Sequence, residues 1–448
     1  MDIKLFNSLH DRVETFVPLQ PGKVTMYVCG PTVYDYVHIG NLRPVVVFDV
    51  LKKLFLALGY QVKHVSNFTD IDDRIIAKAQ QEKTDELSIA KRYIAAYQAD
   101  VNEMNALLPD ATPTVTAHLK AMIEFIQDLI EKDFAYRTHS GDVFFRVSKI
   151  KDYGKLSHIH LDENEVGARI EVNPEKENPF DFALWKRTTE GIKFPAPFGE
   201  GRPGWHTECV VMIHQTFHQP LIDIHGGGFD LKFPHHENEI AQAQAAYQTH
   251  LANYWLHNGF INLNDEKMSK STGNLMLAKD FLKTFSGPLL RYILLATHYR
   301  MPVNVNQSII DNAQQELKKI QLALSQLATG IQLKGGNIQT KETLQAPETF
   351  LLALANDINT ANALTILHQA VKEVNQFLRQ KDTDVSILLN RFFTIQAMLA
   401  ILGLAIKYPI LTAEDRQLYQ DYLEAKTNQD FNRSDAIRKI LNERNIFF

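Results

Sequence analysis

Cysteine is scarce in this chain, which has only 2 cysteines, Cys29 and Cys209, among 448 residues. Two cysteines cannot build a disulfide framework, and these two are too far apart to form a local Cys-x-x-Cys pair. Free thiols are typical of a reducing compartment. We therefore expect an intracellular protein in which both cysteines are reduced.

Long apolar runs and a secretory leader are also missing. The longest apolar stretch, PVVVFDVLKKLFLAL, is interrupted by Asp49 and by Lys52 and Lys53, whereas a membrane-spanning helix needs about 20 predominantly apolar residues. The first residues, MDIKLFNSLHDRVETF, contain no basic-then-apolar signal and no small-residue cleavage site. Together with a mean hydropathy of −0.21, this predicts a soluble, cytoplasmic protein with no membrane partner.

An excess of positive charge is absent as well. The formal net charge is −5 and the pI is about 6.4, which excludes a protein that coats nucleic acid non-specifically. Any contact with RNA must then come from a local basic surface. The hydrophobic fraction of 45% over 448 residues allows more than one core, in roughly two to four domains.

The order of the apolar segments favours an α/β fold. KVTMYVCG is expected to be a strand stopped by Gly30-Pro31, NLRPVVVFDVLKKLFLALGY a long helix ending at Gly59, and QVKHVSN the next strand. A helix this apolar must be buried against a sheet, and the strand–helix–strand order gives parallel strands. TDIDDRIIAKAQQEK then begins with acidic residues, as the first turn of a helix favours.

The pattern changes between about residues 115 and 200. SGDVFFRV is typical of a strand, but the stretch up to PAPFGEGRPGW is polar and rich in proline and glycine, which indicates an insertion or a small separate domain. The α/β pattern returns with GWHTECVVMIHQTF (helix), PLIDIHGGG (strand) and PHHENEIAQAQAAY (helix). Residues 310–405 are almost wholly helical in pattern, and EDRQLYQDYLEAKTNQDFNRSDAIRKILNER predicts a further helical segment.

The two cysteines have potential partners in FPHHENEIAQ. Its proline suits the first turn of a helix, which places His235 and Glu239 one turn apart on one face. With Cys29 and Cys209 they offer the four ligands of a tetrahedral zinc. His236, three residues before Glu239, is a rival ligand. Two buried thiols beside an unrelated histidine pair explain the same pattern without any metal.

Two further stretches indicate a phosphorylated ligand. His38-Ile-Gly-Asn41 follows a strand and a glycine turn and opens a long helix, where backbone N–H groups and the helix dipole attract phosphate. In DEKMSKSTGN, Lys267 and Lys270 lie in a polar loop and can follow charge on a leaving pyrophosphate. A solvated surface loop is the alternative. HGGGFD, from residue 225 to 230, adds only a place where the backbone can approach a ligand closely.

HIGN (38–41) together with KMSKS (267–271) resembles the signature pair of class I aminoacyl-tRNA synthetases. The surrounding sequence resembles the cysteinyl-tRNA synthetases in particular, in the same order and over nearly the whole chain. The stretches that carry this resemblance are MYVCGPTVYDYVHIGN, SNFTDIDDRI, GRPGWHTEC, DIHGGGFDLKFPHHENEIAQ and NGFINLNDEKMSKSTGN. An unbroken KMSKS within this combination is very specific.

The resemblance implies a role for each candidate residue. It implies that one Zn²⁺ per chain is held by Cys29, Cys209, His235 and Glu239. It implies that ATP is bound at the HIGN turn by His38, Gly40 and Asn41, and that Lys270, with Lys267 in the same signature, stabilises the triphosphate in the transition state. The residues implied to line the amino-acid pocket are Thr69, Trp205 and His206.

The resemblance also implies a Rossmann-type parallel-sheet catalytic domain split by an insertion, then an α-helical bundle and a small C-terminal anticodon-binding domain. The expected divisions are 1–115 and 201–255 for the catalytic halves, 116–200 for the connective-peptide insertion, 256–312 for the stem-contact region with the KMSKS loop, 313–405 for the tRNA-binding bundle, and 406–448 for the anticodon-binding region.

The reaction implied is the ATP-dependent activation of L-cysteine to cysteinyl-adenylate, with Mg²⁺ accompanying ATP, and its transfer to the 3'-terminal adenosine of tRNA(Cys). A cysteine thiol is softer and far more acidic than a serine hydroxyl, so a zinc ion that reads the substrate thiolate separates the two amino acids where shape alone is poor at it. A monomer is the family's expectation.

Two features depart from the family pattern. Asn41 occupies the fourth position of the first signature, where the family usually has histidine, and an amide donates a hydrogen bond but carries no charge. The chain also stops at Asn445-Ile-Phe-Phe448, where the family usually continues with a short tail that contains Gly, Thr and Trp and ends in basic residues. The resemblance therefore implies adenylate formation more directly than it implies a contact with the anticodon.

Two other functions share these motifs. A ligase of the same fold passes cysteine to an amino sugar, as the mycothiol-type enzyme does. Against it stands the C-terminal helical segment, which resembles the synthetases' own end and carries Arg433, Arg438, Lys439 and Arg444 at helical spacing. The second alternative is a non-catalytic nucleotide- and metal-binding paralogue, which has no need of an intact KMSKS.

Overall fold

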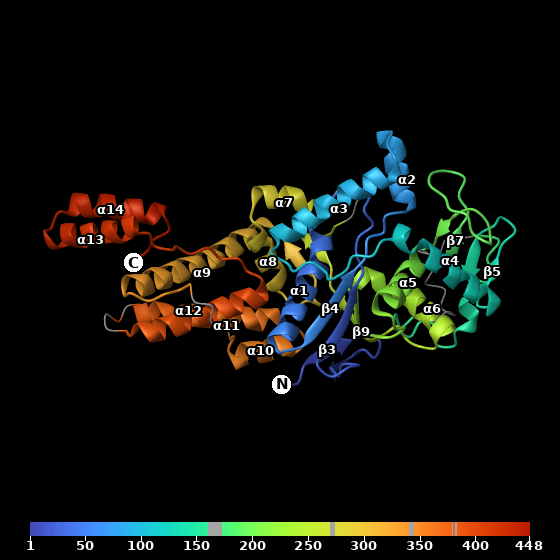
Figure 1. Ribbon diagram of the computed structural model, residues 1–448, viewed down its shortest axis with the longest axis horizontal. Helices are drawn as coiled ribbons and strands as arrows, with labels where there is room; N and C mark the ends of the chain where they lie inside the picture. Colours follow the sequence, from blue (N-terminus) through green and yellow to red (C-terminus); the bar gives the residue numbers. More distant parts are fainter. Residues whose placement is uncertain (160–172, 269–273, 340–344, 379, 381–382) are drawn as a thin grey trace.

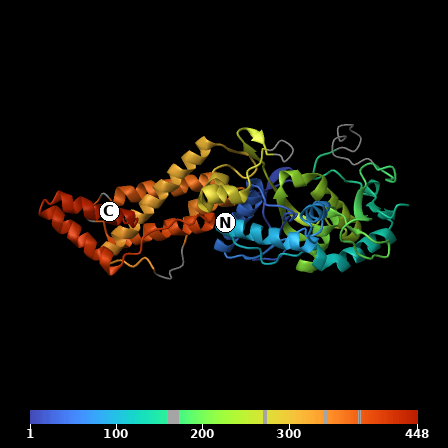
Figure 2. The same ribbon diagram turned by 90° about the horizontal axis from the view of Figure 1, so that it is seen from above.

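The computed structural model describes residues 1–159, 173–268, 274–339, 345–378, 380 and 383–448. The molecule is elongated, with a mixed α/β half at one end and a purely helical half at the other (Figures 1 and 2). The chain starts near the middle of the long axis and ends in the helical half.

The centre of the α/β half is a sheet of four parallel strands in the order β10-β9-β3-β4. Its strands are β3 (Lys23–Val28), β4 (Gln61–Ser66), β9 (Ile222–Gly228) and β10 (Ala252–Asn258). This confirms the expected parallel α/β fold. β3 and β9 pair with each other at the centre of the sheet. The sheet therefore joins a segment that precedes the insertion to one that follows it.

The helix that follows the HIGN turn is buried on nearly every side. The turn itself is Ile39–Asn41, and α1 runs over Leu42–Ala57 and ends just before Gly59, whose φ of 87° suits a glycine after a helix. α1 contacts the sheet on one side and helices of the C-terminal half on the other. A helix that is apolar all round is expected in such a position.

Two helices and a hairpin complete the N-terminal part. α2 (Asp73–Glu82) is capped by the Asp72 side chain, and α3 (Glu86–Glu103) is capped by Asp85. Both caps accept a backbone N–H of the first turn, which stabilises the helix start. The hairpin of β1 (Lys4–Asn7) and β2 (Arg12–Thr15) contacts β10 at the edge of the central sheet.

The insertion contains a helix that the sequence analysis missed. α4 (Val115–Glu131) is capped by Thr114, and it buries Met122, Phe125 and Leu129 against α5 (Trp205–Phe217) and α6 (Glu237–Tyr247). An antiparallel sheet in the order β5-β6-β7-β8 follows it. Its strands are β5 (Ala135–Arg137), β6 (Val143–Phe145), β7 (Phe182–Lys186) and β8 (Arg202–Pro203).

A small sheet lies between the two halves of the molecule. β11 (Ile261–Leu263) pairs with β13 (Val303–Val305) in parallel and with β12 (Glu266–Lys267) in antiparallel orientation. The helices α7 (Ala278–Thr284) and α8 (Gly287–Leu295) lie between these strands in the sequence. The bundle that follows consists of α9 (Gln307–Leu333), α10 (Glu348–Ala355), α11 (Thr360–Leu378) and α12 (Val385–Leu402).

A buried ion pair ties the bundle to the α/β half. Arg291 of α8 contacts Asp49 of α1, and its guanidinium also donates to the carbonyl oxygens of Met104 and Leu402. Both side chains are almost fully buried. Gly403 follows α12 without a side chain because a Cβ there would overlap this guanidinium.

Helix α12 is long and apolar enough to span a membrane by length and composition, with a mean hydropathy of 1.7 over 18 residues. The sequence analysis expected no such segment. In the structure the helix packs within the bundle, where Leu388, Phe392 and Met398 are buried against α9 and α11. Its apolar character is thus used in a protein core.

The expected C-terminal helical segment is a helix pair. α13 (Ala413–Thr427) and α14 (Phe431–Glu443) are separated by a turn in which Gln429 has a φ of 57° and Asp430 caps α14. Arg444 forms ion pairs with Glu414 and Asp415, and Arg438 donates to the Tyr422 hydroxyl. Two of the four basic residues noted in this segment therefore hold the pair together.

Candidate active site

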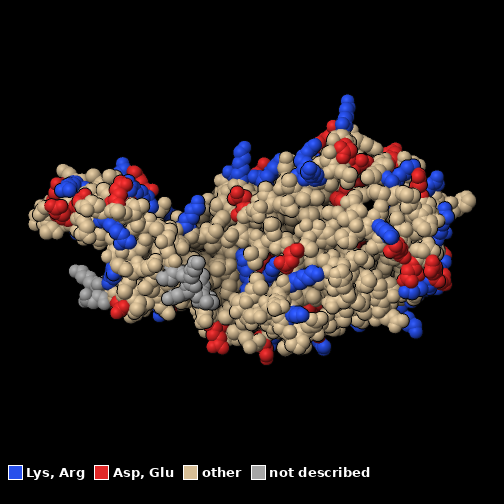
Figure 3. All heavy atoms as spheres, in the orientation of Figure 1, with Lys and Arg blue, Asp and Glu red and all other residues tan. Residues whose placement is uncertain are grey.

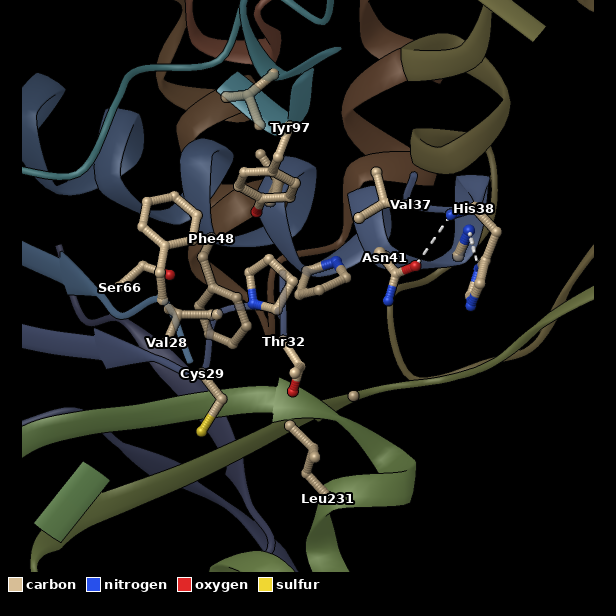
Figure 4. Close-up of a pocket in the computed structure, with 18 of the residues that line it drawn as sticks. Val28, Cys29, Thr32, Val37, His38, Asn41, Phe48, Ser66, Tyr97 and Leu231 are labelled. Atoms are coloured by element: carbon tan, nitrogen blue, oxygen red, sulfur yellow. Dashed lines mark hydrogen bonds between the residues drawn. The ribbon is translucent and has the colours of Figure 1, made fainter. Parts of the chain in front are cut away.

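A cavity of about 610 Å³ opens at the carboxyl ends of β3, β4 and β9. Ligands of open parallel sheets bind at such edges. Cys29 lies at one end of the cavity, and the HIGN turn lies at the other (Figure 4). We refer to these as the cysteine end and the nucleotide end.

Four chemically suitable side chains meet at the cysteine end. Cys29 follows β3, Cys209 comes from α5, and His235 and Glu239 come from the start of α6 and the turn before it. One ligand atom from each lies within 4.8 Å of the others. The two sulfur atoms are 3.7 Å apart, and His235 Nε2 is 3.7 Å from Cys209 Sγ and 2.8 Å from Glu239 Oε1.

A second set of four shares two members with the first. Cys29 and Glu239 also lie within 4.8 Å of ring nitrogens of His225 and His236. His236 Nε2 is 3.3 Å from Cys29 Sγ, and its Nδ1 lies 2.8 Å from His257 Nε2. The geometry alone therefore keeps both histidines of the FPHHENEIAQ stretch beside the thiols, as the sequence analysis left them.

The chemistry of this cluster fits a bound cation. Both carboxylate oxygens of Glu239 are fully buried, and among the described residues neither has a hydrogen bond of good geometry. They face His235 and His225 at 2.8 and 2.7 Å instead. Buried polar atoms without a partner are costly, and a metal site removes that cost.

The thiols lead to the same conclusion. Burial raises the pKa of Cys29 to about 11, and burial together with Cys29 raises that of Cys209 well above its usual value. Without a cation both sulfurs remain protonated at neutral pH. A divalent ion reverses this because it favours the thiolate.

The histidine and carboxylate of the cluster are strongly coupled. Burial lowers the pKa of His235, but Glu239 and Cys209 more than offset it and raise the pKa to about 10. Burial would raise the pKa of Glu239, and the nearby His235 and His225 bring it well below its usual value. The carboxylate is therefore ionised and available as a ligand.

Of the three residues expected in the amino-acid pocket, Trp205 and His206 contact this cluster, and Thr69 contacts Glu208. Trp205 stacks on His235 with ring centroids 4.1 Å apart, and it is 37% exposed toward the cavity. His206 Nδ1 lies 3.1 Å from His235 Nδ1, and burial lowers the His206 pKa well below its usual value. The hydroxyl of Thr69 donates to Glu208 at 2.5 Å.

Glu208 is a residue that the sequence analysis missed. It is fully buried between His206 and Cys209, and burial raises its pKa well above the usual value although the Thr69 hydrogen bond opposes this. An acidic residue on the apolar face of the expected helix GWHTECVVMIHQTF was the available signal. Its contact fixes the orientation of Thr69.

The backbone N–H groups of the HIGN turn all donate to acceptors within the protein. His38 N–H donates to Asn41 Oδ1, Gly40 N–H donates to His38 Nδ1, Ile39 N–H donates to Met276 O, and Asn41 N–H donates to His38 O. The sequence analysis expected these N–H groups to meet phosphate. Because they are taken, a phosphate contact there has to come from side chains, and the Asn41 amide nitrogen points away from its own capping bond (Figure 4).

The two lysines of KMSKS are placed differently. Lys267 belongs to strand β12, whose backbone pairs with Asn262 of β11. Lys270 lies outside the described residues. Met268, between them, lines the cavity near Gly40 of the HIGN turn. The described part of the signature, Lys267 and Met268, thus leads from strand β12 toward the nucleotide end.

A second cavity of about 290 Å³ lies between the insertion and the catalytic half. Trp205 lines both cavities, so its indole forms part of the wall between them. Arg202 of β8 pairs with Asp73 of α2 at the edge of this second cavity.

Comparison with known families and sequences places these features in context. The family described as tRNA synthetases class I (C) catalytic domain matches residues 15–315, and the DALR domain matches residues 349–407. The curated cysteine–tRNA ligases of Staphylococcus aureus strains MSSA476 and NCTC 8325 / PS 47 are each 42% identical over 457 aligned residues, which cover 99% of this chain and 97% of the relative.

Solved structures share the fold at low sequence identity. A methionyl-tRNA synthetase of Mycobacterium tuberculosis in complex with methionyl-adenylate has a TM-score of 0.60 at 15% identity, covering 85% of this chain and 89% of its own. A protein described as a putative arginyl-tRNA synthetase of Campylobacter jejuni has a TM-score of 0.57 at 15% identity, covering 88% and 94%.

Proposed function

This chain belongs to the cysteine–tRNA ligase family of class I tRNA synthetases, and from that premise we propose that it activates L-cysteine with ATP and transfers it to tRNA(Cys). The observation that carries the proposal is the cluster of two thiols, a histidine and a carboxylate at one end of the cavity that has the HIGN turn at its other end. The cavity then offers adjacent binding places for a cysteine side chain and an ATP molecule.

At the cysteine end we assign the metal ligands to Cys29, Cys209, His235 and Glu239, with one Zn²⁺ per chain. When bound, Zn²⁺ supplies a soft Lewis acid that favours the thiolate of the substrate over a serine hydroxyl. Trp205 and His206 hold the ligand histidine in place from the cavity side. Thr69 is buried behind the pocket and donates to Glu208, so we assign it a supporting role there.

At the nucleotide end His38, Gly40 and Asn41 position ATP, which is accompanied by Mg²⁺. The cysteine carboxylate attacks the α-phosphorus, the bond from that phosphorus to the bridging oxygen breaks, and pyrophosphate leaves. Lys267 and Lys270 neutralise the charge that develops on the pyrophosphate. The protein's contribution to this step is mainly alignment and charge stabilisation.

In the second step a ribose hydroxyl of the 3'-terminal adenosine attacks the activated carbonyl, and AMP leaves. We assign tRNA binding to the helical half, which contains the DALR domain at residues 349–407. α13 and α14, at the far end of the molecule (Figure 1), are our candidates for the anticodon contact. We propose a cytoplasmic monomer as the working form.

The test is cysteine-dependent exchange of pyrophosphate into ATP, with serine as the matched competitor. We expect exchange with cysteine at least about a hundredfold faster than with serine, together with about one zinc per chain by elemental analysis. Exchange without amino-acid selectivity, or active protein that contains no metal, contradicts the assignment.

Charging of unfractionated tRNA then separates the remaining functions. Incorporation of labelled cysteine into tRNA supports the ligase. Exchange without tRNA charging favours transfer to another acceptor such as an amino sugar, and failure of both assays favours a non-catalytic protein.

A further inference from the structure

Arg43 is a fully buried arginine directly after the HIGN turn. Its guanidinium donates to three backbone carbonyl oxygens, those of Phe260 at 2.8 Å, Met301 at 2.5 Å and His298 at 3.3 Å. No carboxylate pairs with it among the described residues, and its Nε has no partner there. Burying a guanidinium on carbonyl oxygens alone is costly, so the arrangement calls for a reason beyond helix stability.

The carbonyl oxygens that Arg43 binds lie at the base of the small sheet. Phe260 immediately precedes β11, and its carbonyl also accepts the N–H of Val303, the first residue of β13. β11 in turn pairs with β12, the strand that contains Lys267. Arg43 therefore fixes the base of the sheet whose strand β12 contains Lys267.

The chain that follows β12 is tied to the HIGN turn directly. Ile39 N–H donates to Met276 O at 3.0 Å, and Ala278 N–H donates to Val37 O at 2.9 Å. The chain on this side of β12 is thus fastened to the residues of the turn by backbone bonds. Arg43, two residues beyond Asn41, fastens the other side.

We propose that Arg43 is a positioning residue that sets the separation between the HIGN turn and strand β12, which contains Lys267 of KMSKS, during adenylate formation. This inference rests on the proposed function, because it assumes that the lysines act on the pyrophosphate. The guanidinium suits the task since its planar fork reaches carbonyl oxygens of two different loops at once, whereas an ammonium is a single point of attachment.

The test compares Arg43→Lys with Arg291→Lys. Arg291 is equally buried, and it also donates to backbone carbonyl oxygens, but those belong to Met104 and Leu402 and not to the small sheet. Both variants keep the positive charge and lose the fork. Each is assayed by cysteine-dependent pyrophosphate exchange, at a temperature at which circular dichroism shows it folded.

We expect Arg43→Lys to lower kcat about ten- to a hundredfold and to raise the KM for ATP, because small displacements of reacting groups have effects of that size. The KM for cysteine and the metal content should stay at the wild-type values. Arg291→Lys should lower the melting temperature without changing either KM. Equal kinetic effects of the two variants, or a change in the KM for cysteine with Arg43→Lys, would overturn the proposal.

A milder variant keeps the test decisive if Arg43→Lys does not fold. Asn304 of β13 accepts the N–H of Asp265 at 2.9 Å and donates to its carboxylate at 2.6 Å, which clasps the turn between β11 and β12. Asn304→Ala should lower kcat a few-fold and leave the KM for cysteine unchanged. Unaltered exchange in this variant contradicts a role for the position of strand β12. Absence of exchange in the wild-type protein would instead reject the proposed function itself.

Discussion

The two ends of the central cavity are built in opposite ways. At the cysteine end, side chains from β3, α5 and the start of α6 converge on one point, and their chemistry decides what binds. At the nucleotide end, the backbone N–H groups of the HIGN turn donate to acceptors within the protein. Backbone hydrogen bonds also join the turn to neighbouring segments. If the proposed function holds, selectivity resides in side-chain identity at one end, whereas rate depends on backbone placement at the other.

The largest effect is expected from Cys209→Ser, which breaks the cysteine end. Replacing a soft sulfur by a hard oxygen removes a metal ligand, so we expect metal content well below one per chain and a loss of cysteine-dependent exchange of roughly a thousandfold or more. Elemental analysis and exchange assays measure the two effects.

Thermal melting is the control for this variant. Cysteine affinity that survives while the protein melts early would show a purely structural metal instead of one that reads the substrate. Glu208→Gln, which leaves the four ligands intact, should retain metal and serves as the matched variant.

The next effect concerns the nucleotide end. Lys270→Ala should slow adenylate formation about a hundredfold, because it removes charge that stabilises the leaving pyrophosphate. Cysteine binding, followed by the fluorescence of Trp205 and the other tryptophans, should not change. Exchange near the wild-type rate would remove Lys270 from the mechanism.

A pH experiment extends the comparison to protonation. The titrating groups of the cysteine end are coupled to one another. His64 of β4 lines the same cavity, and both of its ring nitrogens are buried without a partner among the described residues. Burial, with a smaller contribution from Lys52, lowers its pKa to about 4.

The sign follows from the unfolded value of about 6.5. Above that pH His64 is neutral in both states and has no effect; as the pH falls from about 6.5 toward 4, only the unfolded chain gains the proton, so stability is lost. At pH 5 the loss amounts to about 2 kcal/mol. The free energy of unfolding of His64→Leu, measured with denaturant at about pH 7.5 and about pH 5 to bracket this window, should lack this part of the pH dependence. An unchanged dependence would assign it to other groups.

The smallest effect is expected from Asn41→Ala. This change removes the acceptor of the His38 N–H, which is worth about 1 kcal/mol as a helix cap. We expect the KM for ATP to rise about fivefold with an unchanged KM for cysteine. Asn41→His, which restores the residue usual in the family, should be close to wild type. An effect on cysteine instead of ATP would show that the two ends are not independent.

How much the sequence could predict differs between these regions for physical reasons. The parallel sheet and α1 follow from local periodicity and apolar content, and they were expected correctly. The meeting of Cys29 with Cys209 requires β3 and β9 to be neighbours, which no local pattern encodes. The residue types alone allowed a shared metal site beside a reading without metal, and the resemblance to a family decided between the two.

The features that the sequence did not predict have physical causes as well. The amphipathic pattern of α4 lies at the start of a polar region, so the composition of residues 115–200 masked it. The helical segment expected at the C-terminus is confirmed, and its division into α13 and α14, for which no prediction was made, depends on a left-handed Gln429. One N–H of the HIGN turn, that of Ile39, is bound by the carbonyl oxygen of Met276, far along the chain, which no local pattern indicates.

Helix α9 connects the small sheet to the terminal helices. It begins beside β13 and extends over Gln307–Leu333 toward the terminal helices, where Gln332 bonds the backbone of Pro409 and Leu411. At a rise of 1.5 Å per residue its length is about 40 Å, so a tilt of about five degrees at its base moves the far end by roughly 3.5 Å. If tRNA binds the terminal helices as proposed, this one helix connects that contact to the small sheet whose strand β12 contains Lys267.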